Sequence, residues 1–130
     1  MIEMTYTLEQ CVKMVKQNAN DYSYDNLGRQ KDSDDFYEKY GFRREDTWNL
    51  DYSILIYILP RLAYLRDTCV GCPVSLGEDG TMEEWKGILD KIVTGIYKCL
   101  EDDGYYKEEN AESIKEAGEL MLKYFGDLWD

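Results

Sequence analysis

Apolar residues recur at helical spacing in several segments of the chain, and no stretch of strand length alternates between apolar and polar residues. The clearest stripe runs from Trp85 to Leu100, where apolar side chains fall three or four positions apart. A helix with one such stripe buries it against its neighbours. We therefore predict an all-α fold, with residues 1–130 forming a single compact bundle of four long helices and one short helix.

Local signals predict where these helices begin. Thr7 with Gln10, and Thr81 with Glu84, each have the spacing of a capping box, in which side chains satisfy the free amide groups of a first helical turn. In chain order we expect a helix from Leu8 that ends before Asn18, a loop over 20–32, a short helix from Ser33 to Gly41, a helix over 46–67, a connection over 69–80, a helix from Thr81 to near Gly104, and a last helix over about 108–124.

The segment 46–67 is apolar nearly all round, since leucines, isoleucines and alanine occupy almost every helical face. A helix of this kind is typically surrounded by other helices, so we expect it to be the central one. Pro60 lies inside this segment, where it removes one backbone donor and clashes with the carbonyl of Ile56. We therefore predict a kink at Pro60.

The chain is strongly acidic, with a net charge of −12, and the acids are concentrated after residue 75. Direct contact with nucleic acid or with anionic lipid requires basic surface, so we expect neither. The segment Met1–Gln10 lacks a signal-peptide pattern, and the longest apolar run, Ile54–Leu65, is too short to span a membrane. We expect a cytoplasmic protein.

The chain contains no histidine, the commonest general base and metal ligand. It also lacks a GxxxxGK[ST] or GxGxxG phosphate-binding loop. We therefore predict a protein that is not an enzyme and that uses no cofactor or metal.

Four cysteines are present, and Cys69 and Cys72 have CxxC spacing. A zinc site would need Cys11 and Cys99 to complete it, and these are single residues on two predicted helices. Zinc binding and thiol redox chemistry remain alternatives to our preferred interpretation, which is reduced thiols packed as small apolar side chains.

Acidic residues gather at the predicted helix ends, where the helix dipole favours acids in first turns. Solvated helix ends are one interpretation, and a partner surface that attracts a basic groove is the other. The candidate partner-binding residues of this acidic face are Glu78, Asp79, Glu83, Glu84, Glu101, Asp102, Asp103, Glu108 and Glu109.

A smaller group of arginines and aromatic residues surrounds the segment 46–67. Arginine with aromatic rings can hold a nucleotide by stacking and by forked phosphate contacts. Alternatively, the arginines of this segment pair with local acids such as Asp51 or Asp67, or cover the core with their stems. The candidate ligand-binding residues are Arg43, Arg44, Trp48, Tyr52, Arg61 and Arg66.

Several short motifs together resemble a family of short acidic proteins encoded in many bacteriophage genomes and prophages. The resemblance covers about residues 41–130 and is carried by Thr47-Trp48-Asn49-Leu50-Asp51, Ile58-Leu59-Pro60-Arg61-Leu62, Glu83-Glu84-Trp85, Ile88-Leu89-Asp90-Lys91, Tyr124-Phe125 and Leu128-Trp129-Asp130. It implies a phage context, in which small accessory proteins often disable a host defence or redirect a host enzyme. It supplies no active site.

Three functions remain open from the sequence. We predict an anti-defence protein that binds and inhibits a host protein, preferably a nucleic-acid-handling enzyme, through the acidic face. The alternative is a sponge that sequesters a cyclic nucleotide immune signal in the arginine and aromatic pocket, at the interface of a homo-oligomer. A minor virion or structural component is the third.

Overall fold

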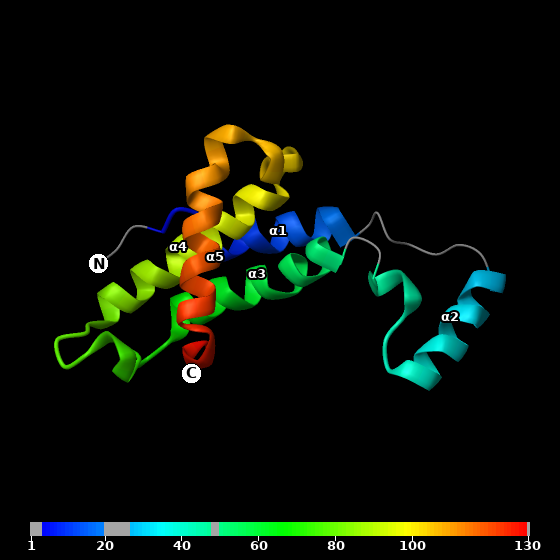
Figure 1. The fold of residues 1–130 in the computed structure, drawn as a ribbon, viewed down its shortest axis with the longest axis horizontal. Helices are drawn as coiled ribbons and strands as arrows, with labels where there is room; N and C mark the ends of the chain where they lie inside the picture. Colours follow the sequence, from blue (N-terminus) through cyan, green and yellow to red (C-terminus); the bar gives the residue numbers. More distant parts are fainter. Residues whose placement is uncertain (1–3, 20–26, 48–49, 130) are drawn as a thin grey trace.

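The computed structural model describes residues 4–19, 27–47 and 50–129, and these residues form helices and no strand. The all-α prediction is therefore confirmed for the described part of the chain (Figure 1). The α-helices are α1 (Leu8–Ala19), α2 (Leu27–Tyr40), α3 (Leu50–Thr68), α4 (Met82–Leu100) and α5 (Ala111–Lys123). Short 3₁₀ turns lie between or after them: η2 (Arg44–Thr47), η3 (Val74–Leu76), η4 (Glu101–Tyr106), η5 (Glu108–Asn110) and η6 (Phe125–Asp127).

Both predicted helix starts are confirmed by hydrogen bonds. The amide of Gln10 donates to Thr7 Oγ1 at 3.2 Å, and the amide of Thr7 donates to Gln10 Oε1 at 2.8 Å. At the second start, the amide of Glu84 donates to Thr81 Oγ1 at 3.0 Å. These caps satisfy amide groups that the first turns of α1 and α4 leave without helical partners.

Other boundaries differ from the prediction. Helix α2 begins at Leu27, inside the segment expected to be a loop, whose residues 20–26 lie outside the described part of the chain. Gly28 falls in the first turn of α2, where backbone amides make no helical bond, and Arg29, Gln30 and Lys31 are good helix formers. Turn-forming composition alone therefore overestimated the loop.

The last two predicted helices are shorter than expected. Helix α4 ends at Leu100, and the residues up to Tyr106 form η4. Helix α5 begins at Ala111, after the 3₁₀ turn η5 has taken up residues 108–110. Asp102 and Asp103 have positive φ angles, which no α-helix accommodates, so the backbone must leave the helix there.

The expectation that the segment 46–67 forms the central, surrounded helix is wrong. Helix α4 occupies that position, because it packs against α3, α5 and α1 and carries most of the buried side chains. Helix α3 keeps a face on which the side chains are about half exposed or more: Leu50, Ile54, Tyr57 and Tyr64. Figure 1 shows the reason, since α2 lies apart from the other helices and does not cover this face.

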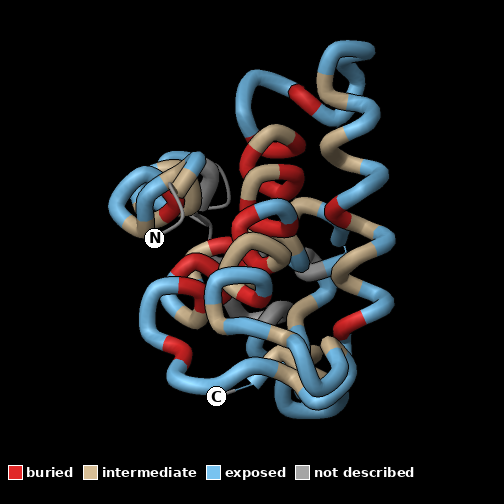
Figure 2. Tube along the Cα trace, turned by 90° about the vertical axis from the view of Figure 1, so that its left-hand side faces the viewer, coloured by how far each residue is buried: buried red, intermediate tan, exposed pale blue. Residues whose placement is uncertain are grey.

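The core has two connected parts around α4. One contains Leu59, Ile92 and Val93, to which α1 contributes the fully buried Cys11. The other contains Trp85, whose ring meets the ring of Tyr124 edge-on at 5.6 Å between centroids. Figure 2 shows the buried residues gathered inside the body formed by α1, α3, α4 and α5, with exposed residues around them.

Helix α3 continues through Pro60 without interruption. Pro60 has no amide hydrogen, so the carbonyl of Ile56 lacks its helical donor. The next carbonyl, that of Tyr57, accepts a hydrogen bond from Arg61 Nη1 at 2.6 Å. The kink itself stays a prediction.

Among the described residues, no helix combines the length and the apolar character needed to cross a membrane.

Helices α4 and α5 approach each other closely at Gly95. A Cβ atom on Gly95 would lie 2.2 Å from the Cβ of Ala117 and 2.8 Å from the carbonyl oxygen of Ser113. Lys98, one turn further along α4, donates to Ser113 Oγ at 3.1 Å. Only glycine permits this crossing, which fixes the position of α5 over α4.

The substitution Gly95→Ala is therefore expected to lower the free energy of unfolding by about 1–3 kcal/mol, because the added methyl group overpacks the crossing. Gly87 lies in the same helix with open space around an added Cβ, so Gly87→Ala should instead stabilise by up to about 1 kcal/mol through helix propensity. Urea denaturation followed by circular dichroism measures both variants. Equal effects would contradict the close crossing.

Candidate functional site

An open groove of about 370 Å³ lies between α3, α4 and α5. Its floor is formed by the C-terminal half of α4, and its two walls come from the N-terminal half of α3 and from α5. Apolar side chains dominate the lining, and among the described residues Asp51 is the one charged residue in it. We call it the α3–α5 groove; it is lined by Asp51, Tyr52, Ile54, Leu55, Gly95, Ile96, Cys99, Tyr105, Ile114, Ala117, Gly118 and Met121.

One end of the groove adjoins the segment 101–109, which we call the acidic loop. Its residues Asp102 and Asp103 have φ angles of 47° and 55°, in the left-handed region that aspartate tolerates better than most residues. Strain of this kind costs about 1–3 kcal/mol per residue and persists only when surrounding contacts hold the backbone in place.

Three contacts hold the acidic loop. Gly104 packs against the backbone carbonyl of Lys98 so closely that a Cβ there would clash. The Asn110 side-chain amide donates to the carbonyl of Gly104 at 3.0 Å. The Tyr52 hydroxyl donates to Asp103 Oδ1 at 3.4 Å, which ties the loop to a residue of the groove wall.

Two tyrosines of the loop remain largely exposed. Tyr105 lines the groove and is 60% exposed, and Tyr106 beside it is 80% exposed. Their rings meet edge-on with centroids 5.2 Å apart. The pKa of Tyr52 is raised by partial burial and by the nearby Asp103 carboxylate, so its hydroxyl stays a protonated donor. The groove thus ends in acids and aromatic rings.

The structure places the predicted acidic face in two separate patches, and all nine of its residues are exposed. Glu78, Asp79, Glu83 and Glu84 lie at the N-terminal end of α4, whereas the other five belong to the acidic loop beyond its C-terminal end. A helix of 19 residues is about 28 Å long, so the patches are far apart. Only the acidic loop adjoins the groove.

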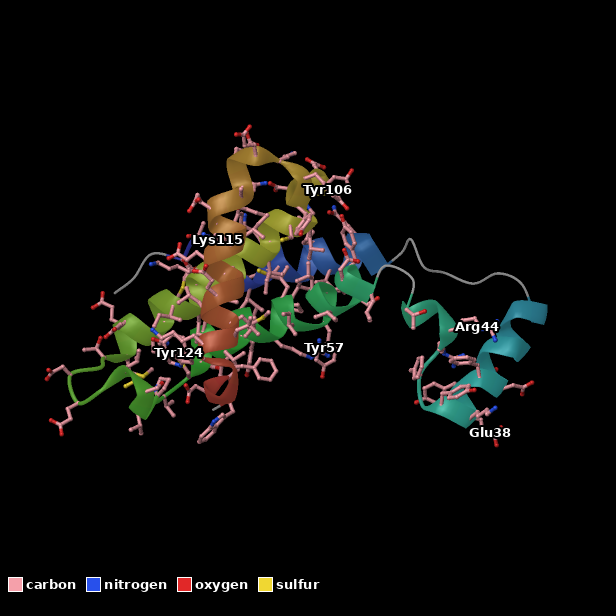
Figure 3. All side chains as sticks on the ribbon, in the orientation of Figure 1. Glu38, Arg44, Tyr57, Tyr106, Lys115 and Tyr124 are labelled. Carbon is pink, nitrogen blue, oxygen red and sulfur yellow. The ribbon has the colours of Figure 1, made fainter. Side chains whose placement is uncertain are left out.

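The arginine and aromatic candidates are not brought together. Arg61 is exposed on α3, with its guanidinium 3.8 Å from the ring centroid of Tyr57. Arg43 and Arg44 lie with α2 and η2, each 5.1 Å from an aromatic ring there, and Figure 3 shows Arg44 far from Tyr57. Tyr52 lines the groove, and Trp48 lies outside the described residues.

Arg66 has a structural role that separates it from the other arginines. It is fully buried, and its Nη1 donates to Asp90 Oδ1 at 2.9 Å while its Nε donates to Asp67 Oδ1 at 3.0 Å. Asp90 also accepts the amide of Thr5 at 3.2 Å and the hydroxyl of Thr5 at 2.9 Å. This network joins α3, α4 and the segment before α1. The pairing of Arg66 with Asp67 is the one that the local-pairing interpretation predicted.

The cysteines are all free thiols, and only Cys72 is exposed. Cys69 donates to the carbonyl of Arg66 at 3.7 Å, whereas Cys72 donates to that of Gly80 at 3.6 Å. Burial raises the pKa of Cys11 to about 11, although the nearby Arg66 charge opposes this, and burial also raises the pKa of Cys99. A metal site requires at least three histidine, cysteine or acidic side chains close together. The described residues contain no such group.

No protein-family model, curated protein or solved structure matches the chain. The resemblance to phage-encoded proteins therefore stays a prediction, and the geometry of the groove carries the functional argument.

Sequence reasoning missed the groove because its residues come from three helices. Two signals were available: Gly95 and Gly118 lie within helical patterns, where an isolated glycine often marks a close approach or a functional need. Tyr105 and Tyr106 are adjacent aromatic residues in a polar segment, which is typical of a contact surface. Neither signal identifies which helices are neighbours.

Removal of the Asp90 carboxylate tests the structural role of Arg66. We expect Asp90→Ala to lower the free energy of unfolding by about 3–5 kcal/mol, because it removes the more deeply buried of the two carboxylates that pair with the buried Arg66 guanidinium. Glu116 forms an exposed ion pair with Lys91 at 3.1 Å, and Glu116→Ala should cost about 1 kcal/mol or less. Chemical denaturation of both variants provides the comparison. A loss for Asp90→Ala as small as that of the control would contradict a buried charge network.

Thiol reactivity tests the burial of the cysteines. In the folded protein at neutral pH, an aromatic disulfide reagent should modify Cys72 quickly and the other three thiols only upon unfolding, because burial shields these three from the reagent. Burial also raises the pKa of Cys11 and of Cys99, which therefore form little thiolate. The colour released over time reports the number of fast thiols, and Cys72→Ser should abolish the fast phase. Two fast thiols in the unmodified protein would contradict the burial of Cys11, Cys69 or Cys99.

Proposed function

We propose that this protein is a non-enzymatic binding protein that holds an amphipathic helix of a partner protein in the α3–α5 groove. The carrying observation is the combination of an open apolar groove with the acidic loop at its end. Grooves of this kind receive the apolar face of a helix, whose side chains three, four and seven positions apart serve as anchors.

The chemistry of the groove specifies the partner helix. The apolar lining, which includes Leu55, Ile96 and Met121, favours leucine-like or aromatic anchors. Asp51 in the lining and the acidic loop at the end favour lysine or arginine on the flank of the helix. Opposite charges of this kind mainly increase the association rate and select the partner. Tyr105 and Tyr106 supply exposed aromatic area of the kind enriched at protein interfaces.

The partner class follows from charge and from the phage resemblance. A basic partner surface is typical of enzymes that handle nucleic acids, since they neutralise phosphates with lysine and arginine. We therefore propose a cytoplasmic phage accessory protein of the anti-defence type that inhibits such a host enzyme without contacting nucleic acid itself. The second acidic patch, at Glu78–Glu84, is a further attractive surface for the same partner.

The groove rests on the four helices of the body, which we propose to act as one bundle with α3 bent at Pro60. Pro60 offers no amide to the carbonyl of Ile56, and the next carbonyl accepts Arg61. A bend at this point turns the N-terminal half of α3, which forms the groove wall, relative to its C-terminal half. No geometric observation favours the nucleotide sponge or the virion component.

Filling the groove tests the proposal. Gly118 lines the groove and has nothing within 4 Å of an added Cβ, so Gly118→Leu places its side chain in the groove. Gly87 also has open space around an added Cβ but lies outside the groove lining, so Gly87→Leu is the control. Tagged wild-type protein should recover a host protein from lysate in a salt-sensitive manner. Gly118→Leu should reduce that recovery at least tenfold, which corresponds to about 1.4 kcal/mol, while Gly87→Leu leaves it unchanged.

Two results would contradict the proposed function. One is the recovery of no salt-sensitive partner by the wild-type protein. The other is equal recovery by the two leucine variants, provided that circular dichroism shows both to be folded.

A further inference from the structure

One exposed face of α3 has the side-chain spacing of a coiled coil. Its residues are alternately four and three positions apart from the first residue of the helix to the last. Two helices with this spacing can insert the side chains of each into the gaps of the other. We call this face the α3 seam, and all six of its residues are exposed: Leu50, Ile54, Tyr57, Arg61, Tyr64 and Thr68.

The α3 seam is apolar although it meets solvent. A helix face that contacts only water is normally polar. Four large apolar side chains of the seam, those of Leu50, Ile54, Tyr57 and Tyr64, are 49–61% exposed. The buried residues of α3, such as Leu59, lie on the opposite side of the helix. Contiguous exposed apolar area of this kind indicates a contact surface.

The two polar side chains of the seam are held against their own helix. Arg61 Nη1 donates to the carbonyl of Tyr57 at 2.6 Å, and its guanidinium lies 3.8 Å from the centroid of the Tyr57 ring. The hydroxyl of Thr68 donates to the carbonyl of Tyr64 at 2.7 Å. The second face of the planar Arg61 guanidinium can still receive an aromatic ring.

The seam is complementary to a second copy of itself, because its spacing is symmetric about the level of Leu59. When two seams run antiparallel across a two-fold axis at that level, Leu50 faces Thr68 of the second copy. Ile54 then faces Tyr64, which pairs two apolar side chains at each end. In the middle, Tyr57 faces Arg61 of the second copy, so each guanidinium lies between two tyrosine rings.

Charge favours the antiparallel pair. In a parallel pair, Arg61 of one copy would face Arg61 of the other. Asp51 and Asp67 lie on opposite flanks of the seam, so in the antiparallel pair no acid of one α3 faces an acid of the other. The six seam residues include no acid, and a chain of net charge −12 associates with itself at the least electrostatic cost through such a surface. A basic partner, as proposed for the groove, finds no opposite charge in the seam.

We propose that the protein forms a homodimer in which the α3 seams of two copies pack antiparallel across a two-fold axis. Each α3 is already held by its own body, so association does not require a helix to nucleate. The seam is about 27 Å long, and an interface of this size gives weak, reversible association. Among the six seam residues only Ile54 also lines the groove, so the dimer stands independently of the proposed function.

Acidic substitutions in the seam test the dimer. Sedimentation velocity resolves the 15.3 kDa chain from its dimer, and the wild-type protein should dimerise as its concentration rises. Tyr57→Glu/Tyr64→Glu places two acids in each seam and should raise the dimer dissociation constant at least tenfold. Tyr37→Glu/Tyr40→Glu makes the same change at tyrosines of α2 that are 51% and 52% exposed, and should leave the constant unchanged.

Two results of this experiment would overturn the inference. One is a wild-type protein that remains monomeric up to about 1 mM. The other is an equal effect of the two glutamate variants, with circular dichroism showing both to be folded. Host-protein recovery by Tyr57→Glu/Tyr64→Glu reports on the groove separately, since neither tyrosine lines it.

Cysteine cross-linking tests the orientation without acidic substitutions. In a Cys72→Ser background the remaining native thiols are buried, and Leu50→Cys or Thr68→Cys adds one thiol at either end of the seam. A short bis-maleimide should cross-link an equal mixture of the two variants but neither variant alone, because like ends lie about 27 Å apart in the antiparallel dimer. Cross-linking of Leu50→Cys to itself would indicate a parallel pair. That result, or a mixture that does not cross-link, would overturn the inference.

Discussion

The close crossing of α4 and α5 at Gly95 determines the position of the other elements of the site. Because Gly95 has no side chain, the backbone of α5 at Ser113 and Ala117 can rest directly on α4. Helix α3 packs along a different side of α4, and the space between α3 and α5 becomes the groove. A second close approach, of Gly104 to the carbonyl of Lys98, fixes the acidic loop at the groove end. Two glycines therefore shape the floor and the end of one site.

The Arg66–Asp90 pair gives the body a second constraint, which is electrostatic. A buried ion pair loses hydration on both sides, and it is tolerated only when further hydrogen bonds satisfy the charged groups. Thr5 supplies such bonds to Asp90, and Asp67 accepts one from Arg66 Nε, so the network joins the segment before α1 to α3 and α4. The buried Arg66 Nη2 makes no hydrogen bond within the described part of the chain. The network fixes the positions of α3 and α4 relative to each other, and both helices line the groove. Arg66 is thus used inside the protein and is unavailable to a ligand.

Features encoded by neighbouring residues could be predicted from the sequence, and features that depend on helix pairing could not. The caps at Thr7 and Thr81 and the buried stripe of α4 follow from local spacing, and they were confirmed. Tyr57 and Tyr64 are exposed because none of the described helices covers that face of α3, which no local pattern reports. The left-handed pair Asp102 and Asp103 depends equally on distant contacts, from Tyr52 and around Gly104.

Because α2 lies apart from the body, the chain has both an open groove and an aromatic cluster around Phe36 that the body does not cover (Figure 1). Had α2 packed on the body, it would have covered apolar area on α3 and removed the exposed rings around Phe36 at the same time. With both surfaces open, the folded chain forgoes about 25 cal/mol of stabilising free energy for each Å² of apolar surface that stays hydrated. Under the proposed function, a binding partner that covers the groove recovers this free energy, so the incomplete packing of the chain is the driving force for association. The same proposal assigns the acids around the groove the selection of a basic occupant among the helices that could supply apolar area.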